Sequence, residues 1–163
     1  MENKKVKVKS LVNGRLGIKL PDLRLNVRWD RKGQTRMIDF EVLQEAMFDY
    51  GTEYMFKQGM LGIEDMETKI ALGLEPEGAT EPQLIKVLSD EQMKRMMTVM
   101  PIFEFKEEIR TIPKEQILNL VDFAIQNEYS DIRKCDVLKE ITGIDVISAI
   151  RLNREDKEPI KGE

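Results

Sequence analysis

The sequence predicts an α+β fold with an N-terminal antiparallel β-meander, a mostly helical C-terminal half and a small three-helix module at the end. Apolar and polar residues alternate through the first 38 residues, as in strands with one solvated face. After residue 89 the apolar residues recur at helical spacing instead. We therefore expect an α+β domain over residues 1–110 with its meander at 1–38, a helical module over 111–153, and a polar tail over 154–163.

The meander is predicted from alternation and turn residues. Val6 and Val8 alternate with lysines, and Asn13–Gly14 is a strong signal for a type I′ hairpin to a return strand at 16–20. A third strand is expected over 23–29 and a fourth over 35–38. The lysines and arginines of these strands are most simply their solvated face, and the alternative is a docking edge for an acidic partner.

The middle of the chain changes from strands to short helices. Asp39 is a good N-cap for a helix that Gly51 would end, and a second short helix is expected over Thr52–Lys57. Met60–Ile63 is a candidate central strand, although four residues do not distinguish a strand from a buried helix. Asp65 then caps a short helix, and a turn-rich loop follows to Pro82.

The clearest helix start is the capping box that Ser89 and Gln92 form. The helix that it opens carries a methionine stripe at i, i+3, i+4 and i+7, namely Met93, Met96, Met97 and Met100. Such a stripe is usually core filler, but methionine is also frequent where a surface adapts to a partner. A further short helix is expected over Phe103–Ile109.

The C-terminal module is predicted as three helices joined by tight loops. The first runs from Pro113 to about Asn127, the second is capped by Ser130 and closed by Gly143, and the third is capped by Asp145. The single cysteine, Cys135, lies on the apolar face of the second helix. We interpret it as a small buried side chain rather than a nucleophile.

Composition argues against an enzyme. These 163 residues contain no histidine, which excludes triads with an imidazole base and histidine-bearing zinc sites. No glycine-rich phosphate loop joins a strand to a helix, and the acidic residues do not match the spacing of a calcium loop. We therefore predict no catalytic residues, no metal and no cofactor.

Charge is unevenly distributed along the chain. Residues 1–39 hold eleven Lys/Arg and four Asp/Glu, a sum of +7, whereas residues 40–84 hold two Lys/Arg and ten Asp/Glu, a sum of −8. The two segments either lie against each other in one copy or meet between copies. The candidate interface residues are Arg24, Arg28, Trp29, Arg31, Glu64, Asp65, Glu67, Met93, Met96, Met97 and Met100.

Other partners are less favoured by the sequence. The chain as a whole is acidic, with a net charge of −4, so nucleic acid is not the expected partner despite the basic meander. No apolar run has the length of a membrane span, and the N-terminus does not read as a signal peptide. We expect a protein made in the cytoplasm.

Several strings of the sequence resemble a known family. They are LPDLRL at Leu20–Leu25, Trp29 followed by Lys32–Gly33, MLGIEDM at Met60–Met66, KIALGLEPEG at Lys69–Gly78, LKEITG at Leu138–Gly143 and AIRLN at Ala149–Asn153. Together they resemble small proteins that tailed bacteriophages of Firmicutes-type hosts encode among their virion morphogenesis genes. The resemblance covers nearly the whole chain, but the strings carry no catalytic residues.

The resemblance implies a multi-copy structural or assembly protein of the virion, at the head or the head–tail junction, found in the host cytoplasm during assembly. Its partners would be other copies of itself and other virion proteins. The alternative is a non-virion adapter that binds protein or nucleic acid through its C-terminal helices or its basic meander.

Overall fold

The computed structural model describes residues 4–157 and confirms the α+β class, with antiparallel strands first and helices after them. The described chain forms two compact units. The first comprises the residues up to Val87 together with Pro113–Gln116. The second comprises Leu88–Ile112 and the residues from Ile117 onwards.

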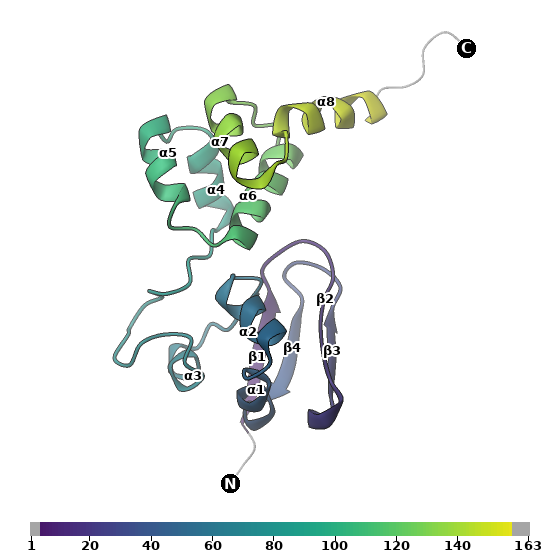
Figure 1. Cartoon of the computed structure of the whole chain (residues 1–163), viewed down its shortest axis with the longest axis vertical. Helices are drawn as coiled ribbons and strands as arrows, with labels where there is room; N and C mark the ends of the chain where they lie inside the picture. The colour runs from purple at the N-terminus through teal and green to yellow at the C-terminus, as the bar shows by residue number, and fades with distance from the viewer. Residues whose placement is uncertain (1–3, 158–163) are drawn as a thin grey trace, which may run out of the picture. The chain divides into compact units, whose positions relative to one another are not determined.

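The first unit is built on antiparallel strands (Figure 1). Strand β1 (Lys5–Ser10) lies between β4 (Thr35–Asp39) and β5 (Leu61–Gly62), and β2 (Leu16–Leu20) pairs with β3 (Leu25–Trp29). Val6 stands opposite Ile38 and Ser10 opposite Leu61. The register therefore places Val6 and Val8 of β1 on one face with Ile38 of β4, whereas Met37 lies on the opposite, solvated face.

Helices α1 (Phe40–Ala46) and α2 (Tyr50–Lys57) cover that apolar face. Leu43 of α1 and Phe56 of α2 share one buried cluster with Val6, Val8 and Ile38. Lys5 and Lys7 of β1 are exposed, as expected for the solvated face of an alternating strand. The alternation in the sequence thus predicted which face of β1 is buried.

The strands do not pair in the sequential order of a meander. β1 pairs with β4 and β5 rather than with β2, so the hairpin expected at Asn13–Gly14 is wrong. Residues 11–15 separate β1 from β2, which is too long for a two-residue turn. The backbone N–H of Ser10 donates to Gln34 O at 2.9 Å, and that of Gly33 donates to Ser10 O at 2.8 Å. These bonds extend the β1–β4 pair past the strand ends.

The short elements after β4 also differ from the expectation in detail. Gly51 lies inside α2 and does not end α1, because Asp49 caps α2 by accepting the Thr52 N–H at 3.0 Å. The expected central strand at 60–63 is β5, which is short and lies at the edge of its sheet. Asp65 precedes helix α3 (Met66–Ala71), as the sequence predicted.

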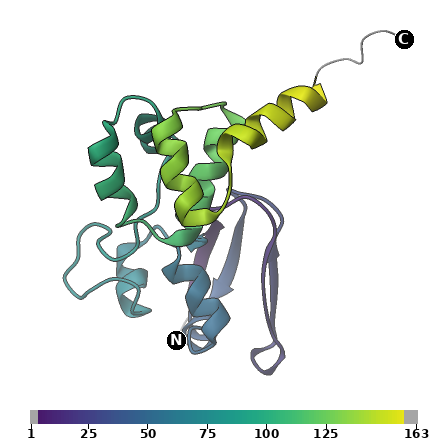
Figure 2. The same cartoon turned by 45° about the horizontal axis from the view of Figure 1, so that its top comes forward.

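The second unit is a helical cluster of α4 (Asp90–Met97), α5 (Ile102–Ile109), α6 (Lys114–Gln126, of which the first turn belongs to the first unit), α7 (Ile132–Thr142) and α8 (Val146–Lys157). Its core joins Phe105 of α5, Leu120 of α6 and Leu138 of α7. Figure 2 shows the end of α8 running beyond the other helices of this unit, and residues 151–156 are exposed.

Capping residues fix the helix ends. Ser89 forms the predicted capping box with Gln92, and Gly143 ends α7 with φ 78°. The N-cap of α7 is Asp131 rather than Ser130, because the Asp131 carboxylate accepts the Lys134 N–H at 3.2 Å. The N-cap predicted from the sequence, Ser130, was therefore wrong by one residue.

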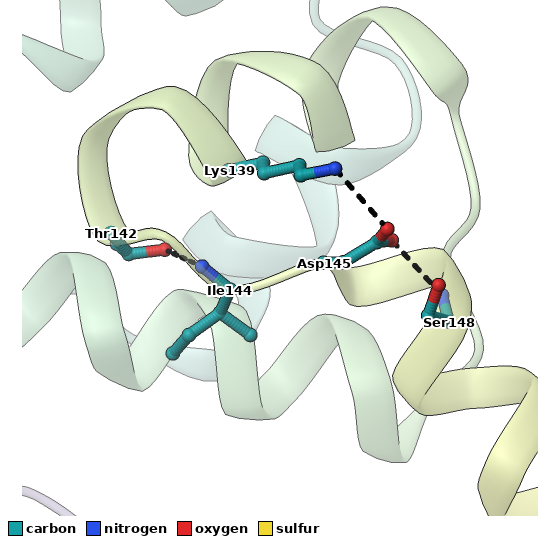
Figure 3. A network of polar contacts seen from close by, with 5 residues as sticks. All are labelled: Lys139, Thr142, Ile144, Asp145 and Ser148. Atoms are coloured by element: carbon teal, nitrogen blue, oxygen red, sulfur yellow. Dashed lines mark hydrogen bonds and ion pairs between the residues drawn. The ribbon is translucent and has the colours of Figure 1, made fainter.

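The junction of α7 and α8 is held by polar contacts (Figure 3). Asp145 accepts the Ser148 N–H at 3.0 Å, and Lys139 Nζ lies 3.5 Å from its other oxygen. The Thr142 hydroxyl accepts the Ile144 N–H at 3.1 Å. Asp145 therefore caps α8 as predicted, and the bonds to Ser148 lower its carboxyl pKa, with a further contribution from Lys139.

The boundary between units lies at Val87–Leu88, whereas the sequence placed it at 110–111. Met93 and Met96 of α4 and Phe105 of α5 lie in the same core as the C-terminal helices, so α4 and α5 belong with them. Of the expected tail at 154–163, residues 154–157 continue α8, and the remainder falls outside the described residues.

Candidate interaction surfaces

The apolar members of the predicted interface are buried. Trp29 is 0% exposed, and its indole N–H donates to Val8 O at 3.0 Å, which anchors β3 against β1. All four stripe residues lie in the core of the second unit, namely Met93, Met96, Met97 and Met100. They are core filler, so neither Trp29 nor the methionine stripe offers surface to a partner.

The three candidate arginines are exposed on the hairpin of β2 and β3 and the turn after it. Arg28 pairs with Asp30 at 3.1 Å. Arg24 (φ 54°) and Arg31 lie beyond opposite ends of β3 and form no ion pair with any described residue. The basic charge of this hairpin thus remains available to solvent or to a partner.

The three candidate acidic residues flank the start of α3 and are exposed. Asp65 lies 3.6 Å from Lys4 Nζ and accepts a hydrogen bond from the Thr68 hydroxyl. This bond, helped by Lys4, lowers the pKa of the Asp65 carboxyl. Glu64 and Glu67 form no ion pair within residues 4–157. The structure therefore joins the basic and acidic segments within one copy at Lys4 and Asp65, and leaves other charges of both segments exposed.

A groove of about 380 Å³ runs between the solvated face of β1 and the start of α3. Lysines line its β1 side, and Glu64 and Asp65 line the opposite side. Met37 of β4, which is 58% exposed, adds an apolar surface. The mixed charge of this groove favours a polar partner with both signs of charge rather than a simple anion.

A second hollow of the first unit, which we call the apolar pocket, lies at the free edge of β5 and has a volume of about 190 Å³. Its apolar lining comprises Leu11, Phe56, Leu61, Ile63, Ile85 and Val87. Lys9 and Lys69 also line it, and neither forms an ion pair with a described residue. Glu75 is 4% exposed and accepts the backbone N–H groups of Gln83 (3.0 Å) and Leu84 (3.2 Å). That carboxylate shapes the loop that borders the pocket.

The sequence reading missed the most exposed aromatic residues. Phe48, in the turn between α1 and α2, is 85% exposed, and Tyr50, the first residue of α2, is 80% exposed. Phe103 on α5 is 76% exposed. The available signal was the position of Phe48 next to Asp49, off the apolar stripe of the preceding helix.

The second unit has a groove of about 390 Å³ between α5 and α7, lined by Ile102, Val137 and charged side chains. Cys135 is buried, as expected, and burial raises the pKa of its thiol to about 11. Lys134 beside it is 2% exposed, and its Nζ has no hydrogen-bond partner in the described chain. Burial lowers the pKa of this lysine, and Asp131 opposes that shift.

The described residues hold no group of three or more carboxylate or thiol side chains placed to bind a metal ion. Within the same residues, every helix is too short or too polar to cross a bilayer. No known protein family, functionally curated protein or solved structure matches this chain.

Proposed function

We propose that this chain is a non-enzymatic structural or assembly protein of a tailed bacteriophage virion, present in many copies and associated with the head or the head–tail junction. The chain would act by contacting other copies of itself and other virion proteins. Its resemblance in sequence to phage morphogenesis proteins supplies the biological setting, and its surface supplies the physical argument.

The observation that carries the proposal is that both charged segments keep exposed, unpaired side chains. Arg24 and Arg31 on one segment, and Glu64 and Glu67 on the other, form no ion pair with the described residues. Complementary exposed charges speed association and orient it, and they suit a protein that meets identical copies. The exposed aromatic side chains Phe48, Tyr50 and Phe103 add the apolar area that such contacts need.

The direct test is mass spectrometry of purified particles from the phage that encodes the chain. We expect the chain in a fixed ratio to the other virion proteins, as symmetry requires. A scaffold or chaperone used only in assembly would instead be found in immature particles and lost from mature ones. Absence from both kinds of particle would refute the proposal.

A second test uses the arginines. Replacing Arg24, Arg28 and Arg31 with glutamate should leave the first unit folded, because exposed charges contribute little to stability. We expect slower incorporation into particles, most clearly at low salt, since the Debye length is only about 8 Å at physiological ionic strength. Unchanged incorporation across a salt series would show that these charges serve no contact between copies.

A non-virion adapter is the second candidate, and the groove between α5 and α7 favours it. Exposed Phe103 lies on the same helix as Ile102, which lines that groove. If the adapter binds DNA through its basic strands, binding to duplex DNA should weaken steeply with added salt. Absence of binding at low salt would remove the nucleic-acid version of this candidate.

A further inference from the structure

Two features of the first unit are open to solvent and complement each other. One is the exposed aromatic pair, which comprises Phe48 in the turn between α1 and α2 and Tyr50 at the start of α2. The other is the apolar pocket at the free edge of β5. Exposed large aromatics and open apolar hollows are both typical of interaction sites.

Backbone hydrogen bonds hold the turn that carries Phe48 and leads into Tyr50. The Phe48 N–H donates to Glu45 O at 3.1 Å, and the Asp49 N–H donates to Ala46 O at 2.9 Å. The Tyr50 ring is tilted against the Tyr54 ring, with 6.3 Å between their centroids. Because the backbone is already fixed, burying these rings in a partner costs little conformational entropy.

The pocket has the size of one aromatic ring. A dry apolar cavity of about 150 Å³ binds benzene, and the pocket measures about 190 Å³. Aliphatic side chains and the Phe56 ring line it, and these are good packing partners for a phenyl group. Val87 borders it and is 38% exposed, so the pocket is accessible from solvent.

The lysines beside the apolar pocket are opposite in charge to the acidic residues beside the aromatic pair. Lys9 and Lys69 line the pocket without an ion-pair partner in the described chain, while Glu75 is held by backbone N–H groups. The aromatic pair is flanked by the exposed acidic residues Glu45 and Asp49. An aromatic side chain beside carboxylates is therefore the ligand chemistry that the pocket favours.

We propose that Phe48, with Tyr50 beside it, inserts into the apolar pocket of a second copy of this chain, and that Glu45 and Asp49 approach Lys9 and Lys69. This inference rests on the multi-copy function proposed above and names the self-contact. Since the pair and the pocket are different surfaces of the first unit, the contact is heterologous, and repetition gives a ring or an open row of copies.

The test is self-association of the purified full-length chain, followed by sedimentation velocity up to about 1 mM protein, the range of a weak contact. Phe48→Ala should weaken association by about 30-fold or more, as for a buried aromatic hot spot. Phe103→Ala is the matched control, because it removes another largely exposed phenylalanine, in the second unit, and should leave association unchanged.

The pocket is tested separately. Val87→Trp fills the border of the pocket and should also abolish association, with far-UV circular dichroism confirming the fold. Because a tryptophan at this site can disturb the core, Lys9→Glu with Lys69→Glu provides a second variant that changes only partly exposed charges. This pair should weaken association most at low salt.

The decisive experiment mixes the variant that lacks the aromatic side chain with the variant whose pocket is filled. A heterologous contact predicts that Phe48→Ala and Val87→Trp chains, each monomeric alone, form a one-to-one dimer together and nothing larger. A wild-type chain that stays monomeric, or a Phe48→Ala chain that associates like wild type, overturns the self-contact. Neither result bears on the virion proposal, which depends on whether the chain is found in particles.

Discussion

Replacing Lys134 with methionine should stabilise the second unit. Lys134 is 2% exposed on α7, and its ammonium has no hydrogen-bond partner in the described chain. Leaving a buried polar group unsatisfied costs about 1–3 kcal/mol. Its compensation is the Phe105 ring, whose centroid lies 5.7 Å from Nζ. Such a contact returns about 0.5–2 kcal/mol.

The substitution to methionine removes both the cost of the unsatisfied ammonium and its favourable contact with the Phe105 ring. Methionine has nearly the length and the helix propensity of lysine, so the substitution should disturb neither the packing around residue 134 nor the stability of the helix. We expect Lys134→Met to raise the free energy of unfolding by about 1 kcal/mol, the cost less the compensation. For a unit of this size that corresponds to a rise in Tm of roughly 4–8 °C.

Two optical probes distinguish the units. Far-UV circular dichroism follows mainly the helices, while fluorescence of Trp29, the single tryptophan, follows the first unit. The Lys134→Met change should therefore appear in the circular dichroism transition. Lys94→Met is the control, because it replaces an exposed lysine of α4 in the same unit that forms no ion pair with a described residue, and it should stay within about 0.5 kcal/mol of wild type.

The pH dependence tests the cause. Burial lowers the pKa of Lys134 from the ordinary value of 10.5, so between the two pKa values the unfolded chain binds more protons than the folded one. Wild-type stability therefore gains from this group as pH rises, and the advantage of Lys134→Met should shrink towards pH 10.5. The raised pKa of Cys135 acts in the opposite direction but is common to both proteins. A destabilised Lys134→Met variant, or an advantage that is constant with pH, would refute the reasoning.

Three further outcomes are expected. Ser89→Ala removes the capping box of α4 and should lower the stability of the second unit by about 1 kcal/mol in urea denaturation. Gly59→Ala should cost about 1–2 kcal/mol for its φ of 71°, plus the crowding of a Cβ placed 3.0 Å from the Gln116 side chain. Gly78→Ala has a similar φ in open space, so the difference between the two variants measures that crowding. Cys135 should react slowly with alkylating reagents at pH 8 in the native protein and rapidly in denaturant, because its buried thiol has a pKa of about 11.

The sequence predicted helix caps and the buried face of a strand, but it did not predict which strands pair. The capping box at Ser89, the closing glycine at Gly143 and the buried face of β1 depend on residues close in the chain, and each was predicted. The partner of β1 depends on which distant strand completes the core. Alternation sets the faces of a strand but not its neighbours, and so the Asn13–Gly14 hairpin was a reasonable but wrong inference.

The same limit applies to the interface residues. A methionine stripe at helical spacing shows that one face is apolar, but burial inside the chain and burial against a partner give the same pattern. In this protein α5, α6 and α7 supply the opposing surface, so the stripe is core. Phe48 and Tyr50 were missed because helical spacing identifies apolar faces, whereas Phe48 lies in a turn and Tyr50 is the first residue of α2.

The burial of Trp29 and the methionines changes which residues can supply energy to an assembly. Exposed ion pairs contribute about 0–1 kcal/mol each, so the arginines and glutamates can orient copies but not hold them together. One aromatic ring buries about 150–250 Å². At roughly 25 cal/mol per Å² that is about 4–6 kcal/mol. This matches only the lower end of the about 4–15 kcal/mol that association costs. A single contact through Phe48 is therefore expected to be weak in solution. In the multi-copy assembly proposed above, repetition of the contact by symmetry would hold the copies together although each single contact is weak.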